Sequence, residues 1–228
     1  MNHYIEKLSK SRNEAFQYDL FHLLLTEGAD FVGRYHFAQL ARTNYVPTTE
    51  TVIPFNALMS YTGNDAFCHC FVDDYQFCRL YRNFDKYIPF MQRTKAMASS
   101  DFSMYRNYST EHQIWNCRKN RAVAYAMQQI KGFETIPTAG FGGPETWEWC
   151  FDGLPTRSSL AITTNGVRND PEARRLFIGG VNALIFQKKP TALIICGEVD
   201  RWIYDKYPGL KIVRIPSFSE QWNERRCA

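Results

Sequence analysis

The sequence has no long hydrophobic run. The longest apolar stretch near its start, LFHLLL at residues 20–25, is far shorter than the roughly 20 residues that a membrane-spanning helix requires. The opening residues, MNHYIEKLSKSRNEAF, contain no apolar core of a secretory signal peptide. We therefore expect a cytoplasmic protein with no membrane partner.

The sequence also lacks the common nucleotide and hydrolase motifs. It contains no GxGxxG fingerprint, no P-loop of the form GxxxxGK[ST] and no G-x-S-x-G nucleophile elbow. No internal repeat, low-complexity tract or linker divides the chain. We therefore expect one domain over residues 1–228, and any site has to be inferred from the arrangement of single residues.

Metal-binding cysteine pairs are absent as well. The seven cysteines are scattered, and an odd number with no leader segment indicates reduced thiols. In FCHCFVDDYQFC (67–78), Cys68 and Cys70 lie on one side of a strand and His69 on the other, because side chains alternate. A structural zinc site needs four converging ligands. Without a second pair, we interpret these as buried thiols and regard the adjacent aspartates as the informative part.

Size and composition fit one soluble domain. The chain has 228 residues, of which 45% are hydrophobic and 22% charged. A chain of this size buries a full core without disulfides or a structural metal. Its net charge of +4 permits a nucleic-acid partner without requiring one. Aromatic residues make up 15%; most should fill the core, although some have the chemistry for stacking on bases.

Short β-favouring runs alternate with helical stretches. The expected strands are 51–58, 67–72, 94–99, 133–139, 160–165, 192–196 and 211–215. Helices are expected between several of them, at about 75–91, 110–131 and 170–189. This alternation predicts an α/β fold with mostly parallel strands joined by right-handed crossovers. We favour a barrel-like (β/α) repeat, complete or incomplete, over the alternative of an open doubly wound sheet.

The helix boundaries carry specific signals. Residues 11–27 have the spacing of an amphipathic helix that stops at Gly28, and residues 1–47 as a whole form a helical and irregular extension. Thr110 and Gln113 predict a capping box for the 110–131 helix, which should end at Gly132. Asn169 or Asp170 should cap the following helix, with Pro171 in its first turn.

Polar residues follow several strands at the carboxyl ends, where parallel α/β folds place working residues. The candidate catalytic residues are Asp73, Asp74, Asp101 and Glu198. Such carboxylates bind Mg²⁺ or Mn²⁺, here through Asp74 and Asp101, or act as an acid and base pair at a glycosidic bond. The alternative is structural: Asp73 or Asp74 caps the next helix and Asp101 caps a turn.

Ligand-binding groups are expected around these carboxylates. The candidates are Ser100, Ser103, Tyr105, Arg118, Arg121, Trp147, Asp152 and Asn165. Arg118 and Arg121 share one helix face and would pair with a phosphate or with the aspartates if that face looked toward the site. The glycine-rich GFGGPETWEW has the features of a loop that approaches a ligand closely, or of a surface loop packed on its tryptophans.

Five motifs in order carry a family resemblance: FVDDYQF, SSDFSMY, EHQIWNCRKNRAVAYAMQQIKGFETIPTAGF, WEWCFDGLP and LIICG. The series, over roughly residues 50–200, resembles a domain family of unknown function carried by phages, plasmids and other bacterial mobile elements. The resemblance implies a similar fold and a location in the cytoplasm of a bacterial host. The family has no established activity that could be transferred to this chain. The chain departs from the family pattern at GFGG, which weakens any role assigned to residues 140–146.

Three functions remain open at this point. The first is an enzyme, such as a metal-dependent hydrolase, that acts on a nucleotide or nucleic acid through the strand-end carboxylates. The second is a non-catalytic module that sequesters a nucleotide or a host defence or replication protein, because no known catalytic motif is present. The third is nucleic-acid binding in replication or its control, which predicts strong salt dependence.

Overall fold

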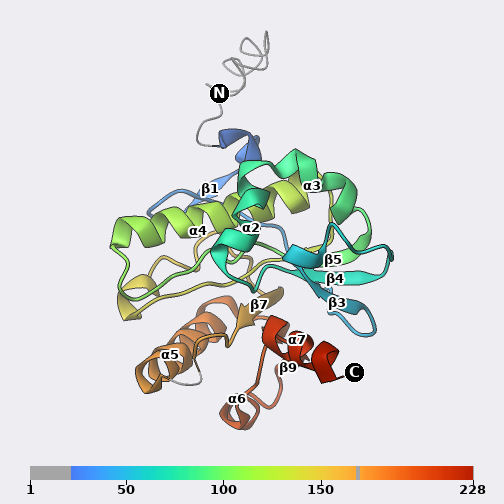
Figure 1. Cartoon of the computed structure of the whole chain (residues 1–228). Helices are drawn as coiled ribbons and strands as arrows, with labels where there is room; N and C mark the ends of the chain where they lie inside the picture. Colours follow the sequence, from blue (N-terminus) through green and yellow to red (C-terminus); the bar gives the residue numbers. More distant parts are fainter. Residues whose placement is uncertain (1–21, 168–169, 228) are drawn as a thin grey trace.

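The computed structural model describes residues 22–167 and 170–227, with side chains as far as Asn223 (Figure 1). Most of the helix expected at 11–27 lies outside the described residues, and Leu23–Thr26 form a 3₁₀ turn, η1. The part of the extension that follows contains a short antiparallel hairpin of β1 (Phe31–Val32) and β2 (Phe37–Ala38). Phe37 and Ala38 are buried, so this part of the extension belongs to the core.

Seven parallel strands form the centre of the described fold, and each overlaps one of the seven predicted runs; β4 and β7 begin one residue earlier than predicted. They are β3 (Thr51–Pro54), β4 (Ala66–His69), β5 (Thr94–Ala98), β6 (Thr135–Ile136), β7 (Ser159–Thr163), β8 (Ala192–Cys196) and β9 (Lys211–Ile215). The order β3-β4-β5-β6 continues through a parallel bridge between Thr138 and Ala161 into β7-β8-β9. Every pairing is parallel and spatial order follows chain order, which confirms the predicted α/β class.

β4, β6, β7 and β8 are buried on both faces, as their continuous apolar composition requires, whereas the outer strands β3 and β9 are partly exposed. In β8, Leu193 and Ile195 face the helices, whereas Ile194 and Cys196 belong to an inner cluster. That inner cluster takes residues from β4 to β9, and Val52 of β3 and Val213 of β9 pack against it. The sheet therefore curls around a shared interior. Within the described residues no ladder joins β9 to β3, so the barrel is open.

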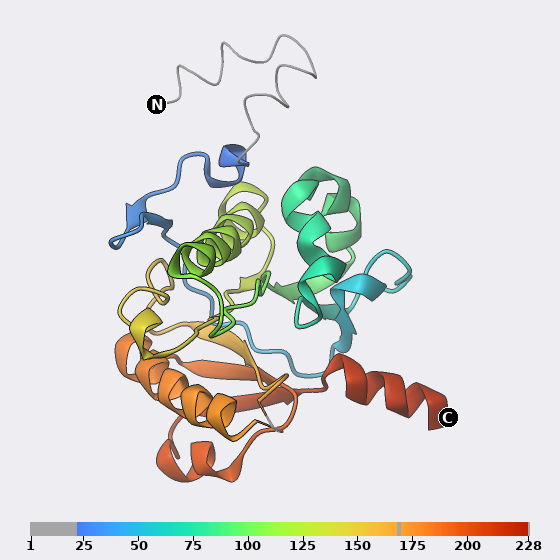
Figure 2. The ribbon, with the colours of Figure 1, turned by 60° about the vertical axis from the view of Figure 1, so that its left-hand side comes forward.

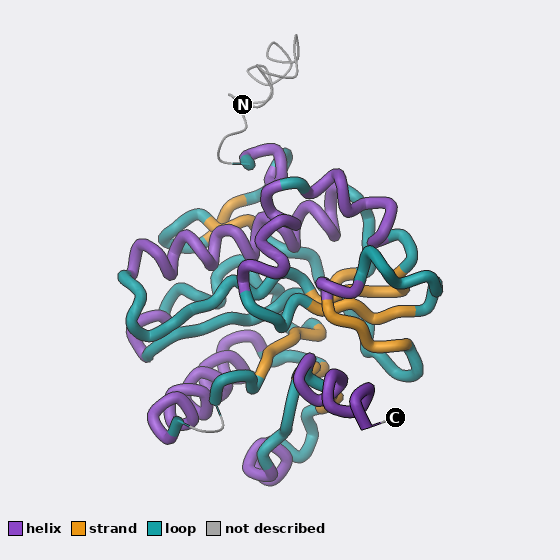
Figure 3. The backbone as a smooth tube through the Cα atoms, viewed as in Figure 1, coloured by secondary structure: helices purple, strands orange, loops and turns teal. Residues whose placement is uncertain are grey.

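Helices surround the central strands (Figure 3). They are α2 (Asp74–Arg82), α3 (Phe84–Met91), α4 (Thr110–Tyr125), α5 (Pro171–Lys188), α6 (Arg201–Lys206) and α7 (Phe218–Cys227). Shorter turns are η2 (Phe55–Ala57), the π-helical turn η3 (Ala126–Ile130) that extends α4, and η4 (Pro144–Thr146). Figure 2 shows α5 lying along the outer side of β7 to β9.

The caps explain where two of these helices begin. The side chain of Asp170 accepts hydrogen bonds from the N–H groups of Glu172 and Ala173, which confirms the predicted cap of α5. The predicted capping box of α4 is wrong. Ser109, one residue earlier, caps the helix, because the Gln113 side chain turns inward and donates to the carbonyl of Tyr105 instead.

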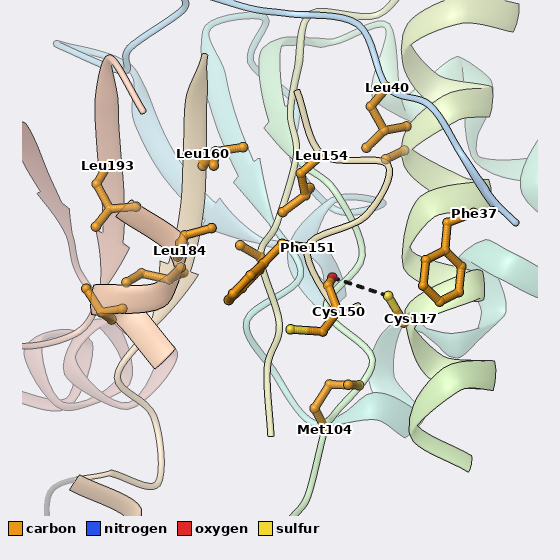
Figure 4. Packing of buried hydrophobic residues seen from close by; sticks show 14 of the residues in the cluster. Phe37, Leu40, Met104, Cys117, Cys150, Phe151, Leu154, Leu160, Leu184 and Leu193 are labelled. Atoms are coloured by element: carbon orange, nitrogen blue, oxygen red, sulfur yellow. Dashed lines mark hydrogen bonds between the residues drawn. The ribbon is translucent and has the colours of Figure 1, made fainter. Parts of the chain in front are cut away.

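The larger core cluster joins α4, α5, the segment 149–154 and the outer face of β7 and β8 (Figure 4). Phe151 lies between Leu160 and Leu184 on one side and α4 on the other, and the Cys117 thiol donates to the Cys150 carbonyl at 3.5 Å. No helix in the described part of the chain is both long and apolar enough to cross a membrane.

The strand alternation predicted for FCHCFV is confirmed. Cys68 and Cys70 pack against the helices in one cluster, and Phe67 and Phe71 face the interior. Burial raises the pKa of both thiols, so they remain protonated. The six cysteines whose side chains are described form no disulfide.

Candidate functional site

A cavity of about 890 Å³ opens at the carboxyl ends of the parallel strands. Its wall comes from the segments that follow β4, β5, β6, β7 and β9, together with the first turns of α5. Asp73, Asp101, Ser103, Tyr105 and Asn165 of the predicted set line it. These five residues all follow strands at their carboxyl ends, where parallel α/β folds place ligand-binding loops.

Asp101, three residues beyond the end of β5, is the chemically distinctive group of this wall. Burial, reinforced by the negative charge of Asp74, raises the pKa of Asp101 from its ordinary 3.8 to about 7, although the buried guanidinium of Arg121 acts in the opposite direction. A carboxyl group with this pKa exchanges its proton at neutral pH. A carboxyl group in a cleft whose pKa is shifted by burial and by a neighbouring charge is a candidate functional residue.

Helices α2 and α4 hold the loop that carries Asp101. Asp74, the first residue of α2, accepts hydrogen bonds from the backbone N–H of Ser103 at 3.2 Å and from its hydroxyl at 2.7 Å. From α4, the buried Asn120 accepts from the N–H of Phe102 at 2.7 Å and donates to its carbonyl at 3.2 Å. The residues immediately after Asp101 are therefore fixed on two sides.

Two further amides of α4 continue this arrangement. Asn116 donates to the carbonyl of Ser103 at 2.6 Å, and Gln113 donates to the carbonyl of Tyr105 at 2.8 Å. Gln113, Asn116 and Asn120 are all buried, and their spacing of three and four residues places them on one helix face. This face binds the main chain of residues 102–105 and sets the course of the cavity wall.

The loop after β6 approaches the same wall closely. A Cβ atom on Gly140 would lie 3.4 Å from Oδ1 of Asp101, and one on Gly142 would lie 3.1 Å from Nε2 of Gln113 and 3.2 Å from the carbonyl of Met104. The glycines therefore let the two loops pack together. Across the mouth, Asn165 donates to the carbonyl of Phe71 at 3.2 Å and ties the end of β7 to that of β4.

The wall carries more negative than positive charge. Its carboxylates are Asp73, Asp101 and Asp170, and Arg106 is the only cation among the described residues that line it. Arg106 is already paired with Asp170 at 2.7 Å and lies 3.6 Å from Glu172. Four aromatic residues also line the cavity: Phe71, Phe141, Phe177 and Phe218.

Comparison with known sequences places this geometry in a family. The family model described as "Domain of unknown function (DUF4417)" matches residues 29–215. The chain belongs to this family. The match covers all seven parallel strands and every segment that lines the cavity, with the exception of Phe218 and Ser219.

Two curated relatives of the DUF4417 chain come from phages. It is 27% identical over 211 residues to the "Gene 1 protein" of Mycobacterium phage D29, covering 92% of this chain and 75% of the relative. It is 28% identical over 211 residues to the "Gene 1 protein" of Mycobacterium phage L5, covering 92% and 89%. No solved structure matches. The expected family of unknown function found in phages is confirmed.

Several predicted residues of the DUF4417 domain lie outside the cavity. Arg121 is fully buried and donates to the carbonyls of Asp152, Thr138 and Cys150, so it holds main chain together behind the wall. Asp152 lies against Gly33. Trp147 donates to the carbonyl of Gly142 at 3.2 Å. Neither these three nor Arg118 lines the cavity.

Ser100 and Glu198 also lie apart from the cavity wall. Ser100 is fully buried at the end of β5, and its hydroxyl has no partner among the described residues. Glu198 lines a neighbouring cavity of about 400 Å³, which shares the wall formed by residues 165–167, Phe177 and Ser219. The four carboxylates predicted as one cluster are therefore divided, with Asp73 and Asp101 in the larger cavity, Asp74 behind it and Glu198 beside it.

Asp73 was a candidate helix cap, and Asp74 and Asp101 were candidate metal ligands. Asp73 occupies the position before α2 without a capping hydrogen bond from its side chain, so the structural alternative does not account for it. Asp74 and Asp101 interact electrostatically, but both oxygens of Asp74 face Ser103. Within the described residues no group of three or more His, Cys, Asp or Glu side chains is placed to hold a metal ion.

Sequence reasoning missed the amides of α4 and Arg106. Gln113, Asn116 and Asn120 form a polar stripe at helical spacing, a signal present in the sequence that resembles an ordinary solvated face. Arg106 follows Tyr105 in a segment without regular structure, and its partner Asp170 is 64 residues further along the chain. Only the folded chain shows that pairing.

Proposed function

We propose that this protein is a hydrolase that acts on a nucleotide or nucleic-acid substrate held in the large cavity, with Asp101 as the group that transfers a proton. The observation that carries the proposal is the position of Asp101, a carboxyl group with a pKa of about 7 that lines a deep cavity at the carboxyl ends of the strands. General acid–base groups are most effective when their pKa lies near the working pH.

The surroundings of Asp101 favour catalysis over a purely structural carboxyl. Helices α2 and α4 fix the loop at Phe102 and Ser103, so Asp101 needs little reorganisation when a substrate is present. Fixed geometry of this kind contributes substantially to enzymatic rates. Asp73, on the same wall, supplies a second carboxylate, as hydrolysis by an acid and base pair requires.

The shape and chemistry of the wall support a nucleotide-sized substrate. A volume of about 890 Å³ lies within the usual range of about 300–1,000 Å³ for ligand pockets. Phe71, Phe141 and Phe177 offer apolar surface to a planar ring, and Asn107 and Asn165 offer amide hydrogen bonds.

The test is turnover by purified protein on nucleosides, nucleotides and single-stranded DNA and RNA, with and without Mg²⁺ or Mn²⁺. Asp101→Asn should lower kcat by at least about 100-fold, the size of a lost general acid or base, and leave binding intact. Asp85→Asn, on an 85% exposed side chain of α3, is the matched control and should change nothing. Tight binding without turnover would contradict the hydrolase and favour a sequestering module.

A further inference from the structure

The charge distribution of the cavity restricts which part of a nucleotide it accepts. Asp73 contributes negative charge, as does Asp101 when it is ionised, and Asp170 forms an ion pair with Arg106, whose guanidinium also lies 3.6 Å from Glu172. A phosphate inside would meet like charges with no unpaired cation among the described lining residues. Like-charge juxtaposition of this kind is strongly unfavourable.

The aromatic residues that line the cavity suit a planar, uncharged group. The ring of Phe141 lies 6.0 Å from that of Phe151 and 5.9 Å from that of Phe177. It also fits against Gly180 of α5, where a Cβ atom would lie 2.2 Å from the ring. Phe141 is therefore held in one position, with Phe71 and Phe177 on the same wall. Rigid rings bind flat apolar faces with little loss of conformational entropy.

The carboxylates and the rings lie in one cavity, so an uncharged base and sugar would meet both. From this arrangement we infer that the cavity takes a nucleoside unit with its phosphates outside, and that the bond cleaved is the N-glycosidic bond between C1′ and the base rather than a phosphate ester. This inference rests on the proposed hydrolase function and names its substrate class.

The reaction balances with water as the only co-reactant. The C1′–N bond breaks with its electron pair on the base nitrogen, which takes the proton of neutral Asp101. The water oxygen bonds to C1′, and the water proton passes to the carboxylate of Asp73. The products are the free base and a sugar with a hydroxyl at C1′, and proton exchange with solvent restores both carboxyl groups. Two carboxyl groups in these roles are the usual equipment for glycosidic hydrolysis.

Binding of adenosine, AMP and ATP, and of the matching guanine, cytosine and uracil series, tests the substrate class without requiring turnover. Without divalent ions at pH 8, each triphosphate should bind at least about tenfold more weakly than its nucleoside, because Asp101 is then largely ionised. Asp73→Asn should narrow that ratio severalfold, whereas Asp85→Asn should leave it unchanged. A triphosphate that binds more tightly than its nucleoside, or failure of every probe to bind, would overturn the inference.

Product analysis separates this inference from the broader proposal. Release of free base and a reducing sugar from a nucleoside or nucleotide, lost in Asp101→Asn, is the expected result. Release of inorganic phosphate or of shorter oligonucleotides without free base would refute glycosidic cleavage while leaving a hydrolase at Asp101 intact. Nucleosides that bind in the expected order without any turnover would refute the hydrolase and retain the substrate class of the cavity.

Discussion

The carboxylate of Asp74 binds Ser103 twice, at its backbone N–H and at its hydroxyl, with the shorter contact at 2.7 Å. The pair joins the first turn of α2 to the loop after β5. It also brings a negative charge close enough to Asp101 to raise the pKa of that carboxyl group. One residue thus both positions the loop and adjusts the acidity of its neighbour.

Removing the charge of Asp74 should therefore make Asp101 a stronger acid. We expect Asp74→Asn to lower the pKa of Asp101 below its value of about 7, because the repulsion that opposes its ionisation is gone. The amide oxygen can still accept a hydrogen bond from Ser103. Carbon-13 NMR titration of the carboxyl groups measures the shift. Asp205→Asn, on a 66% exposed side chain of α6, is the control, and an unchanged Asp101 midpoint would contradict the coupling.

The raised pKa of Asp101 also predicts how stability depends on pH. The unfolded chain releases this proton near about pH 4, whereas the folded protein retains it to about pH 7. Between these values the folded state binds more protons, so its stability falls as pH rises. The loss should reach on the order of 1–4 kcal/mol above pH 7.

Urea unfolding of the wild type and Asp101→Asn at pH 5 and pH 8 isolates this contribution, because all other titrating groups are common to both. The variant should gain stability relative to the wild type as pH increases. A difference between the two proteins that stays constant across this range would show that Asp101 titrates normally.

The two hydrogen bonds between Asn120 and Phe102 should be costly to lose. Asn120→Ala leaves a buried backbone N–H and carbonyl without partners, and we expect it to lower the free energy of unfolding by about 2–4 kcal/mol. Asn107→Ala, at an exposed position of the same wall, should change it by less than about 0.5 kcal/mol. If the two substitutions changed the free energy of unfolding equally, the hydrogen bonds between Asn120 and Phe102 would not stabilise the loop.

A substitution at Gly180, which packs against the ring of Phe141, tests the role of that ring in ligand binding. In Gly180→Ala the new Cβ atom would lie 2.2 Å from the Phe141 ring, so the ring must move toward the cavity. We expect nucleoside affinity to fall at least about fivefold, because a rigid stacking face is displaced. Gly209→Ala, where a Cβ atom meets nothing within 4 Å, should bind normally in the same fluorescence titration. Equal affinity in both variants would exclude Phe141 from the ligand site.

The sequence was informative where local pattern and topology act together. All seven strands were predicted because each is a short β-favouring run with a helix or turn on either side, and the rule for parallel strands then selected Asp73 and Asp101, which both line the cavity. Asp170 was identified as a cap because it stands directly before Pro171. These features depend on residues that are close in sequence.

Long-range contacts account for what the sequence did not reveal. Arg121 has the spacing of a solvent-facing partner for Arg118, yet it turns inward because the carbonyls of Thr138, Cys150 and Asp152 converge on it. The local spacing of Gln113 predicts a capping box. In the folded chain its side chain donates a hydrogen bond to the carbonyl of Tyr105 instead. Neither outcome is encoded in the periodicity of α4.

The midpoint of the Asp101 carboxyl titration tests the central claim most directly. The signal is identified as the carboxyl resonance present in the wild-type carbon-13 spectrum and absent from that of Asp101→Asn. It should titrate near pH 7, as expected for a partly buried carboxyl group beside Asp74. A midpoint near its ordinary 3.8 would mean that Asp101 is fully ionised at neutral pH, and its role as the proton-transferring group of the cavity would be contradicted.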